Sequence, residues 1–340
     1  MQIRLPAEWE EQDGVLLAWP HGATDWSAML DDACRCFTGL VRAISRFEPV
    51  LVVTPDASPL QTVLTTQGID LSRVRIAQLP TNDTWARDFG PVTIQVNNVP
   101  VLLDFGFNGW GLKFAANHDN QVTRKLKQAG FLLPRLNTIG LVLEGGSLES
   151  DGQGTILTTS HCLLSPNRNP QLSRNDIEEA LHNLLGASRV LWLEHGWLAG
   201  DDTDAHIDTL ARLCPDNTIA YITCSDPTDE HYHELKLMEQ ELALFRTADG
   251  SPYRLLPLPW PAAQHDDAGQ RLPATYANFL VINGAVLVPT YNDPADGAAL
   301  AMIGLAFPGR EIIGIDCRPL IQQHGSLHCV TMQLPKGTIA

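Results

Sequence analysis

Short apolar runs with the length of β-strands alternate with helical patterns along the whole chain. This alternation restricts the fold more than any other feature of the sequence. Residues 15–20 form the first run, and the apolar positions of residues 26–44 then recur with a helical period. Residues 279–282 and 285–289 are two later runs, joined by Asn283-Gly284, a strong signal for a two-residue hairpin. Hairpins mixed with helices argue against an all-parallel doubly wound sheet and predict a mixed α/β fold.

The rest of the pattern predicts further elements and no domain boundary. The expected elements are a strand at 50–53, a short helix opened by Ser58-Pro59, a helix capped by Ser173 and ended by Gly186, a helix from Thr228, a helix at 296–306, and strands at 311–315 and 326–332. Residues 255–261 are rich in proline and are expected to form a surface loop. Because no linker or low-complexity segment interrupts the alternation, we expect a single domain over residues 1–340.

Composition narrows the class of protein. The 340 residues are 44% hydrophobic and 18% charged, which is typical of a folded protein and excludes a disordered one. The net charge of −16 argues against nucleic acid or an anionic membrane as a partner and is compatible with a cationic small substrate. Seven cysteines without a C-x-x-C pair, the lack of an apolar run of about 20 residues, and a start without a signal peptide predict a cytoplasmic protein.

Two segments in the first half of the chain carry side chains suited to chemistry. In residues 82–91, the carboxylate of Asp88 follows the aromatic Trp85, an arrangement that could hold a cation, although a capped turn with an internal ion pair is the alternative. Glu144 directly follows an apolar run and precedes Gly145-Gly146. Such glycines permit close approach of a ligand, but a plain hairpin would use them as well.

Two further segments lie in the second half. In residues 200–208, His206 and Asp208 share one face if the chain is extended, and a solvated acidic loop is the alternative. Cys329 follows His328 in a stretch that resembles a strand, where a lone cysteine is most often a small buried hydrophobe. His206, Asp208 and Cys329 could together ligate zinc, but their spacing matches no familiar zinc pattern, so no metal is expected.

Together these residues favour nucleophilic chemistry on a cation. A cysteine with a histidine suggests a thiolate nucleophile and an acid/base partner. Surrounding carboxylates would destabilise the thiolate unless the substrate itself is positively charged. A guanidinium has that charge, and its planar donors match paired carboxylates. The chemistry indicated is attack on a guanidinium carbon.

The same residues identify a family. The chain resembles the agmatine deiminase and bacterial-type peptidylarginine deiminase family, within the guanidine-modifying or pentein superfamily, along nearly its whole length. The matching segments are residues 6–10, 19–21, 84–91, 144–147, 167–170, 200–208, 274–279 and 328–329. Their order and joint presence make the match specific. The resemblance implies a five-bladed α/β propeller of ββαβ modules with pseudo-fivefold symmetry and an active site on its axis.

The resemblance also implies roles for five residues. Cys329 would be the nucleophile and His206 the general acid and base, with Glu144 orienting and charge-balancing the histidine, and Asp88 and Asp208 gripping the guanidinium. A covalent amidino-cysteine would form as ammonia leaves, and water would then release the ureido product. No metal or organic cofactor would be needed.

Departures from the family pattern concern the pocket for the substrate tail. Residues 107–114 look shorter than the corresponding loop of the best-known agmatine deiminases, and Ala205 and His324 stand where glycine is frequent. Trp85 and Trp110 are candidates for packing an aliphatic tail, and Asp202 for binding its far end, although Trp110 is as well explained by a structural role.

Agmatine hydrolysis to N-carbamoylputrescine and ammonia is the favoured hypothesis. A deiminase of peptidyl or free arginine, an amidinotransferase, a non-catalytic protein of the same fold and a zinc-dependent amidohydrolase are the alternatives. The expected partner is a small cationic guanidine, and whether the chain forms a homodimer stays open.

Overall fold

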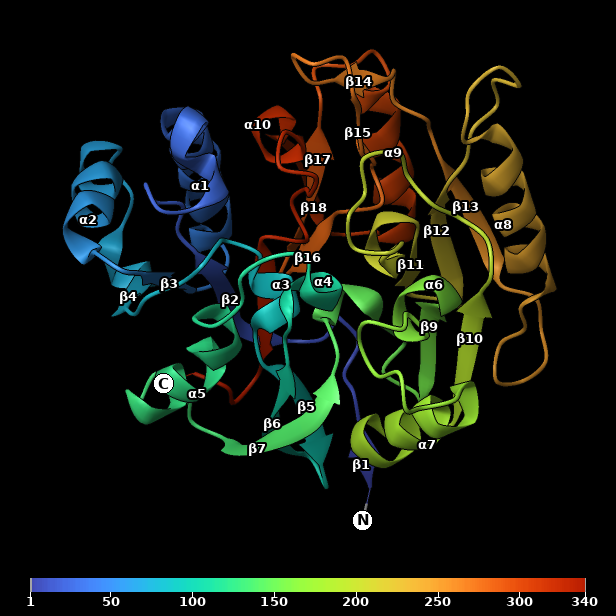
Figure 1. Cartoon of the computed structure of the whole chain (residues 1–340), viewed down its shortest axis with the longest axis horizontal. Helices are drawn as coiled ribbons and strands as arrows, with labels where there is room; N and C mark the ends of the chain where they lie inside the picture. Colours follow the sequence, from blue (N-terminus) through green and yellow to red (C-terminus); the bar gives the residue numbers. More distant parts are fainter. Residues whose placement is uncertain (1, 340) are drawn as a thin grey trace.

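A single strand pattern recurs five times in the computed structural model, which describes residues 2–339. In each of five mixed sheets, the first strand pairs antiparallel with the second, and the second pairs parallel with the third. Helices join the two parallel strands, as a parallel connection requires. Figure 1 shows the sheets around a common centre and the longer helices on the outside. The expected pentein arrangement of ββαβ units is therefore confirmed.

The five units are defined here by their strands and longer helices. Unit 1 contains β19 (Thr331–Pro335), β2 (Gln12–Ala18), α1 (Leu30–Ser45), β3 (Val50–Thr54), α2 (Ala57–Thr66) and β4 (Val74–Gln78). Unit 2 contains β5 (Val92–Val96), β6 (Val99–Gly106), α5 (Val122–Gln128) and β7 (Arg135–Val142), with β1 (Ile3–Arg4) at its edge. Unit 3 contains β8 (Glu149–Ser150), β9 (Thr155–Thr159), α7 (Arg174–Leu185) and β10 (Arg189–Leu193). Unit 4 contains β11 (Ala211–Cys214), β12 (Thr218–Ile222), α8 (Tyr232–Leu244) and β13 (Arg254–Leu258), and unit 5 contains β16 (Leu280–Ile282), β17 (Ala285–Thr290), α9 (Asp296–Ala306) and β18 (Glu311–Asp316).

Short elements connect these units. Those between units are α3 (Ala86–Phe89), α10 (Arg318–Ile321) and the two-stranded hairpin of β14 (Gln264–His265) and β15 (Arg271–Leu272), whereas α4 (Gly109–Leu112) lies within unit 2 and α6 (Ser160–Leu163) within unit 3. Single 3-10 turns occur at Asp25–Met29, Leu71–Arg73, Asp119–Gln121, Gly145–Ser147 and Ile207–Thr209. No helix within residues 2–339 combines the length and apolar character needed to cross a membrane.

Unit 1 is completed by the last strand of the fold. β19 pairs antiparallel with β2, with Thr331 opposite Leu17 and Gln333 opposite Val15. β2 is therefore an inner strand with partners on both sides, and its core residues from Val15 to Ala18 are fully buried. Segments near the two ends of the chain thus form one sheet.

Local sequence signals explain most of these elements. The helical stripe of α1 buries Phe37, Leu40, Val41 and Ile44 completely, and burial of each such side chain contributes about 1.5–3 kcal/mol. The capping box of Ser173 and Asp176 opens α7, as predicted, and Gly186 ends that helix with a φ of 74°.

Other expectations were wrong in detail. The proline-rich stretch is a loop only in residues 259–261: residues 254–258 form β13, whose partner among the described strands is β12, and proline is tolerated at such an edge. The cap of α2 is Asp56, whose side chain accepts from the Ser58 N–H, and α8 begins at Tyr232 rather than Thr228. Residues 327–330 form a turn, so the last strand starts at Thr331.

Candidate active site

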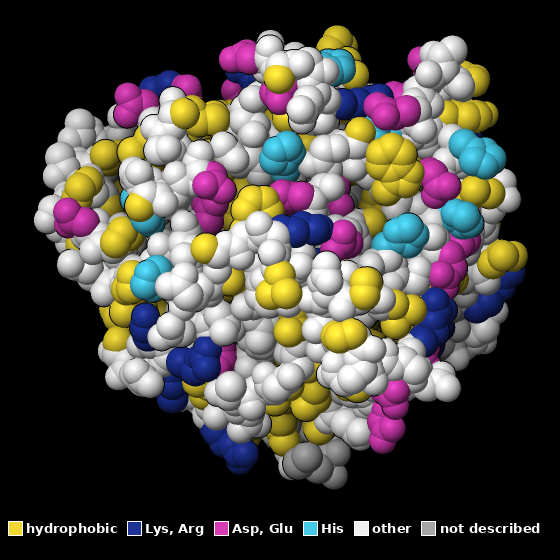
Figure 2. Space-filling view, viewed as in Figure 1, with side chains coloured by type: hydrophobic (Ala, Val, Ile, Leu, Met, Phe, Trp, Pro, Cys, Tyr) yellow, Lys and Arg dark blue, Asp and Glu magenta, His cyan; other side chains and the backbone are white. Residues whose placement is uncertain are grey.

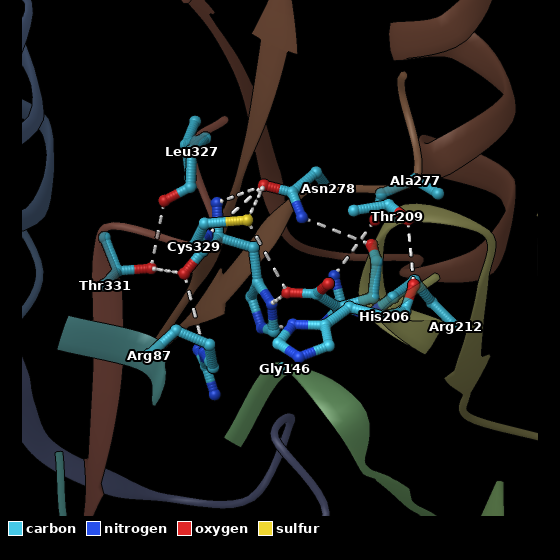
Figure 3. Close-up of polar contacts among 12 residues, drawn as sticks. Arg87, Gly146, His206, Thr209, Arg212, Ala277, Asn278, Leu327, Cys329 and Thr331 are labelled. Carbon is cyan, nitrogen blue, oxygen red and sulfur yellow. Dashed lines mark hydrogen bonds and ion pairs between the residues drawn. The ribbon is translucent and has the colours of Figure 1, made fainter. Parts of the chain in front are cut away.

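The candidate residues occupy equivalent positions in the fold. Each lies just before the first strand of a unit: Asp88 before β5, Glu144 before β8, His206 and Asp208 before β11, and Cys329 before β19. Asn278, which the sequence reading did not single out, fills the same place before β16. Figure 3 shows the Cys329 thiol beside the Asn278 amide, with the His206 imidazole close by on a different segment. The pentein repeat thus brings residues that are far apart in sequence to one point.

A shared turn sets three of these positions. The backbone N–H groups of Ser147, Thr209 and Thr331 donate to the carbonyls three residues earlier, those of Glu144, His206 and His328, at 3.1, 3.2 and 3.0 Å. The three hydroxyls donate to the same carbonyls at 2.6, 2.8 and 3.0 Å. His206 and Asp208 therefore lie on a tight turn, not on the extended segment we expected.

Cys329 lies on such a turn rather than on a strand. Its thiol is buried and lies 3.4 Å from Asn278 Oδ1 and 3.9 Å from Asp208 Oδ2. Asn278 Oδ1 also accepts from the backbone N–H of His328 at 2.8 Å and fixes the turn. Burial, and then the charges of Asp208 and Asp88, raise the pKa of the Cys329 thiol. Without a cation beside it, Cys329 is therefore a thiol, and a nearby cation would favour its thiolate.

Asp88 accepts two well-aligned hydrogen bonds. Its Oδ1 accepts from the Gly146 N–H and its Oδ2 from Trp110 Nε1, both at 2.9 Å. Burial, and then the charge of Asp208, raise the pKa of Asp88 well above its usual range. Two buried carboxyl groups without a cation between them cannot both ionise easily.

Asp208 is the carboxyl group of this pair that ionises more readily. Burial opposes its ionisation, but His328 Nδ1 donates to its Oδ2 at 2.7 Å and lowers the pKa of Asp208. Its Oδ1 is buried without a hydrogen-bond partner. A buried acceptor without a donor costs about 1–3 kcal/mol, which a ligand with N–H groups could recover.

His206 is fully buried, and neither ring nitrogen has a hydrogen-bond partner. Nδ1 lies 3.7 Å from Asp88 Oδ1, and Nε2 lies 4.0 Å from Glu144 Oε2. Burial lowers the pKa of His206 to about 3, against the opposing charge of Asp208, so the imidazole is neutral and free to accept a proton. A Cβ on Gly146 would lie 2.6 Å from His206 Nδ1 and 2.9 Å from Asp88 Oδ1, so only glycine fits between them.

Glu144 is held by an arginine that the sequence reading left without a role. Arg168 Nε lies 3.0 Å from both Glu144 oxygens, and both side chains are completely buried. Burial raises the pKa of Glu144, and the guanidinium of Arg168 opposes that rise. Arg168 belongs to the family-like segment 167–170, which is the only signal that pointed to it.

A second buried network lies behind Cys329. His328 Nε2 lies 2.7 Å from Glu8 Oε2, and Arg212 Nη2 lies 3.1 Å from the same oxygen. Arg212 also pairs with Glu149, and Arg87 points into this network, 3.7 Å from Glu8. Arg87 lies next to Asp88 in the helical turn α3, yet the two side chains contact different partners.

A cavity of about 190 Å³ reaches Cys329 from the surface. Its lining includes the two tryptophans and two of the carboxylates that the sequence suggested, Trp85, Trp110, Asp88 and Asp202. The full lining is Asp25, Asp83, Trp85, Asp88, Trp110, Phe114, Asp202, Thr203, Gln323, His324, Gly325 and Cys329. Neither lysine nor arginine is part of it, whereas Asp208, His206 and Glu144 lie behind its wall. Near the centre of the face in Figure 2, hydrophobic and acidic side chains lie side by side.

The cavity wall combines aromatic rings with acids. Gly325 packs against the ring of Trp85, since a Cβ there would lie 2.2 Å from Trp85 Cζ3. Burial raises the pKa of Asp202 to about 6, and burial raises that of Asp83 to about 6 as well. The cavity therefore has a reactive end at Cys329, apolar walls, and carboxyl groups that a second cation would help to ionise.

The zinc set considered from the sequence does not match the geometry. Within residues 2–339, the clusters with ligand atoms close enough for one ion are Glu144 with Cys162 and His206, and Glu8 with Glu149 and His328. Glu144 is bound by Arg168, and both acids of the second cluster contact Arg212. A guanidinium beside these carboxylates competes with a metal ion for the same oxygens.

Comparison with known proteins identifies the family. The model of the Porphyromonas-type peptidyl-arginine deiminase family matches residues 4–335. An agmatine deiminase of Pseudomonas putida is 34% identical over 98% of this chain and 95% of its own length.

Solved structures agree in fold. A Porphyromonas gingivalis protein with a provisional assignment as an arginine deiminase is 52% identical, with a TM-score of 0.95 and full coverage of both chains. A cysteine-to-serine variant of the C. jejuni agmatine deiminase with substrate bound is 40% identical, with a TM-score of 0.92 over 98% of this chain and 97% of its own. Similarity over nearly the full length thus accompanies the five-unit fold, and the chain belongs to the Porphyromonas-type peptidyl-arginine deiminase family.

Proposed function

We propose that this protein is an agmatine deiminase, which converts agmatine and water to N-carbamoylputrescine and ammonia. The observation that carries the proposal is a cavity with Cys329 and Asp88 at its base, aromatic walls, and further carboxylates but no lysine or arginine in its lining. Agmatine has a guanidinium at one end, an apolar middle and an amine at the other end. The curated relatives and the substrate-bound neighbour, which are named agmatine deiminases, support the same assignment.

Asp88 and Asp208 would bind the guanidinium through their carboxylate oxygens. Asp88 lines the cavity. Asp208 Oδ1 is buried without a hydrogen-bond donor, and Asp208 Oδ2 lies 3.9 Å from the Cys329 sulfur. Burial, and then repulsion by Asp208, raise the pKa of Asp88. A guanidinium between the two carboxylates would offset both effects and lower that pKa. The same cation would lower the pKa of Cys329, so the nucleophile would form only when substrate is bound. Cys162, which is also buried beside carboxylates, does not border this cavity.

The reaction would proceed in two halves. The Cys329 sulfur attacks the guanidinium carbon, its proton passes to His206, and His206 returns a proton to the nitrogen that leaves as ammonia. This step leaves an S-amidino cysteine. Water then gives a proton to His206 and attacks the same carbon. The C–S bond breaks to release the ureido product, the leaving Cys329 thiolate takes a proton back from His206, and the remaining proton passes to solvent. The neutral imidazole of His206 suits the role of proton acceptor, and Glu144 would balance the imidazolium that forms.

The far end of the cavity would bind the amine. Trp85 and Trp110 would pack the four methylene groups, and Asp202, with Asp83 beside it, would bind the ammonium. An ammonium lowers the pKa of a neighbouring carboxyl group, so substrate would bring both acids to their charged forms near neutral pH.

Arginine deimination is the rival function because the family model and the Porphyromonas gingivalis neighbour carry that name. The carboxylate of free arginine would face Asp83 and Asp202 with no lysine or arginine in the cavity wall, so we expect it to be rejected. We expect kcat/KM for agmatine to exceed that for free arginine by at least ~100-fold, a difference of about 2.7 kcal/mol. Ammonia release from agmatine, free arginine and an arginine peptide, measured side by side, tests this assignment. Equal rates, or a faster rate on the peptide, would overturn it and leave deiminase chemistry intact.

Three further expectations accompany this function. We propose that residues 1–340 act as one domain, because segments spread along the chain from Asp25 to Cys329 line one cavity. We propose a cytoplasmic location, because all seven cysteines are unpaired. A homodimer stays a prediction, which size-exclusion chromatography with light scattering would test.

A further inference from the structure

A chain of alternating charges connects one loop of the cavity wall to Glu144. The tryptophan loop, defined as residues 107–114, contains Lys113, whose Nζ donates to Asp204 Oδ1 at 2.8 Å. Asp204 Oδ2 accepts from Arg168 Nη1 at 2.5 Å, and Arg168 Nε binds both oxygens of Glu144. The chain ends 4.0 Å from His206, at Glu144 Oε2.

The tryptophan loop has a conformation that needs outside support. Four consecutive residues have positive φ: Gly109 at 68°, Trp110 at 54°, Gly111 at 83° and Leu112 at 71°. For a residue with a side chain this backbone costs about 1–3 kcal/mol and persists only where its surroundings impose it.

The support comes from the segments that carry Arg168 and Asp204. A Cβ on Gly111 would lie 3.1 Å from the Asn167 Cβ and 3.6 Å from Arg168 Nη1, so the loop packs directly on this segment. Asn108 Nδ2 donates to the Asn167 carbonyl at 2.9 Å, and Lys113 also donates to the Asp202 carbonyl. The ion pair with Asp204 is the charged part of this attachment.

Asp204 is the second anionic partner of Arg168, after Glu144. The guanidinium is completely buried, whereas the Asp204 side chain is 34% exposed and does not border the cavity. Without the charge of Asp204, Arg168 would keep Glu144 and the Thr203 carbonyl, which it contacts at 2.8 Å, but would lose its second anion. A buried charge that loses a partner is strongly destabilised and shifts position.

We propose that Asp204 and Lys113 are positioning residues, which hold Arg168, and through it Glu144, in the geometry that keeps His206 ready for proton transfer. This inference rests on the proposed deiminase function. The tryptophan loop also supplies Trp110 to Asp88, so one loop would set both the guanidinium site and the acid/base pair.

The charges around His206 agree with this role. The titratable and charged groups around it, among the described residues, are Asp88, Asp208, Glu144, Cys162, Arg168, Asp204 and Lys113. Burial is the main cause of the low pKa of His206, Asp204 raises that pKa, and Arg168 and Lys113 lower it. Neutralising Asp204 should therefore lower the pKa of His206 further and move the acid limb of the kcat profile to lower pH.

The test uses two pairs of matched variants of the full chain, with agmatine as substrate. Asp204→Asn is compared with Asp202→Asn, because both are neighbouring acids but only Asp202 borders the cavity. Lys113→Gln is compared with Lys236→Gln, which breaks an exposed ion pair with Glu239 on α8. We expect Asp204→Asn to lower kcat about tenfold with KM within twofold, and Asp202→Asn to act mainly on KM.

The lysine pair extends the test to the tryptophan loop. We expect Lys113→Gln to lower kcat about threefold and Lys236→Gln to leave it unchanged. Adding Lys113→Gln to Asp204→Asn should change kcat by less than twofold, because both act through Arg168.

Two results would overturn the positioning proposal while the wild type turns over agmatine. One is a kcat of Asp204→Asn within twofold of wild type, and the other is an Asp204→Asn variant that changes KM alone, as expected for Asp202→Asn. A wild type that releases no ammonia from agmatine, arginine or an arginine peptide would instead refute the proposed function, and the positioning proposal with it.

Discussion

Replacement of Trp110 by phenylalanine tests the link between the tryptophan loop and Asp88. The substitution removes the indole N–H that donates to Asp88 Oδ2 at 2.9 Å. A phenyl ring keeps the apolar packing against Phe107 and Phe114, whose ring centroids lie 5.0 and 5.5 Å from that of Trp110. The variant should therefore fold and lose one hydrogen bond to a buried carboxylate.

The structure sets the size of the expected effect. A hydrogen bond to a charged group contributes about 1.5–3 kcal/mol, which corresponds to a loss of about 10- to 160-fold in kcat/KM for agmatine. The Trp110 N–H lowers the pKa of Asp88 against the effects of burial and of Asp208. Its removal raises that pKa further, so Asp88 ionises only at higher pH. The acid limb of the kcat/KM profile should move to higher pH.

The assay is ammonia release from agmatine between pH 5 and 9, with thermal unfolding measured in parallel. Trp192→Phe is the matched control, because it also removes an indole N–H bonded to a carboxylate, that of Glu178, at a distance from the cavity. A Trp110→Phe variant with a kcat/KM and an acid limb equal to those of wild type would refute the reasoning that Trp110 keeps Asp88 ionisable.

Three further outcomes are expected. Cys329→Ala should abolish turnover and leave the melting temperature nearly unchanged, whereas Cys224→Ala should keep its rate; measurable turnover by the first variant would exclude Cys329 as nucleophile. His206→Asn should be slowed severely, and intact-mass spectrometry after a quench should find the mass of agmatine less one ammonia on Cys329 in those variants that still acylate; rapid turnover by this variant would argue against His206 as the acid and base. Burial raises the pKa of Glu48 to about 7, so this group binds a proton more tightly in the folded than in the unfolded chain and its contribution to stability falls as pH rises from about 4.5 to 7. In Glu48→Gln the unfolding free energy should therefore fall by up to about 3 kcal/mol less between pH 5 and 8 than in wild type. Denaturant titrations at each pH measure this free energy, and the same dependence on pH in both proteins would contradict the prediction.

Local structure was predictable because its causes are local. The capping box at Ser173, the hairpin at Asn283-Gly284 and the buried stripe of α1 depend on residues within a few positions of one another. The mixed α/β class follows from the same signals. Which strand closes the ring is a long-range matter, since β19 and β2 are separated by nearly the whole chain.

The sequence singled out the candidate residues, but only the family resemblance assigned a role to each of them in one site. The conformation at Cys329 was mistaken for a strand because Leu327 and Val330 give the segment an apolar pattern, whereas the Thr331 hydroxyl closes a turn on the Leu327 and His328 carbonyls. The hydroxyls of Ser147 and Thr209 close their turns in the same way, on the carbonyls of Glu144 and His206. A serine or threonine three residues after each of these candidate residues is a weak repeat in the sequence.

Asn278 and Arg168 escaped notice for different reasons. Asn278 lies between two apolar residues before a strand and has no neighbour in sequence that suggests a role. Arg168 lies in a polar loop, where an arginine is ordinarily solvated. Its burial against Glu144 depends on how units 2 and 3 meet, which no local pattern encodes.

The pairing of β19 with β2 has a consequence for how the protein is made. β2 leaves the ribosome early in synthesis. Its antiparallel partner β19 becomes available only after residue 335 has left the exit tunnel. Cys329 sits on the turn that this final pairing positions, so the thiol meets Asn278 and Asp208 only when the ring closes. Nascent chains and fragments truncated before residue 327 would carry four of the five site segments and would lack Cys329. Incomplete products would therefore be inert toward cellular guanidines, and activity would appear in a single step once β19 has paired with β2.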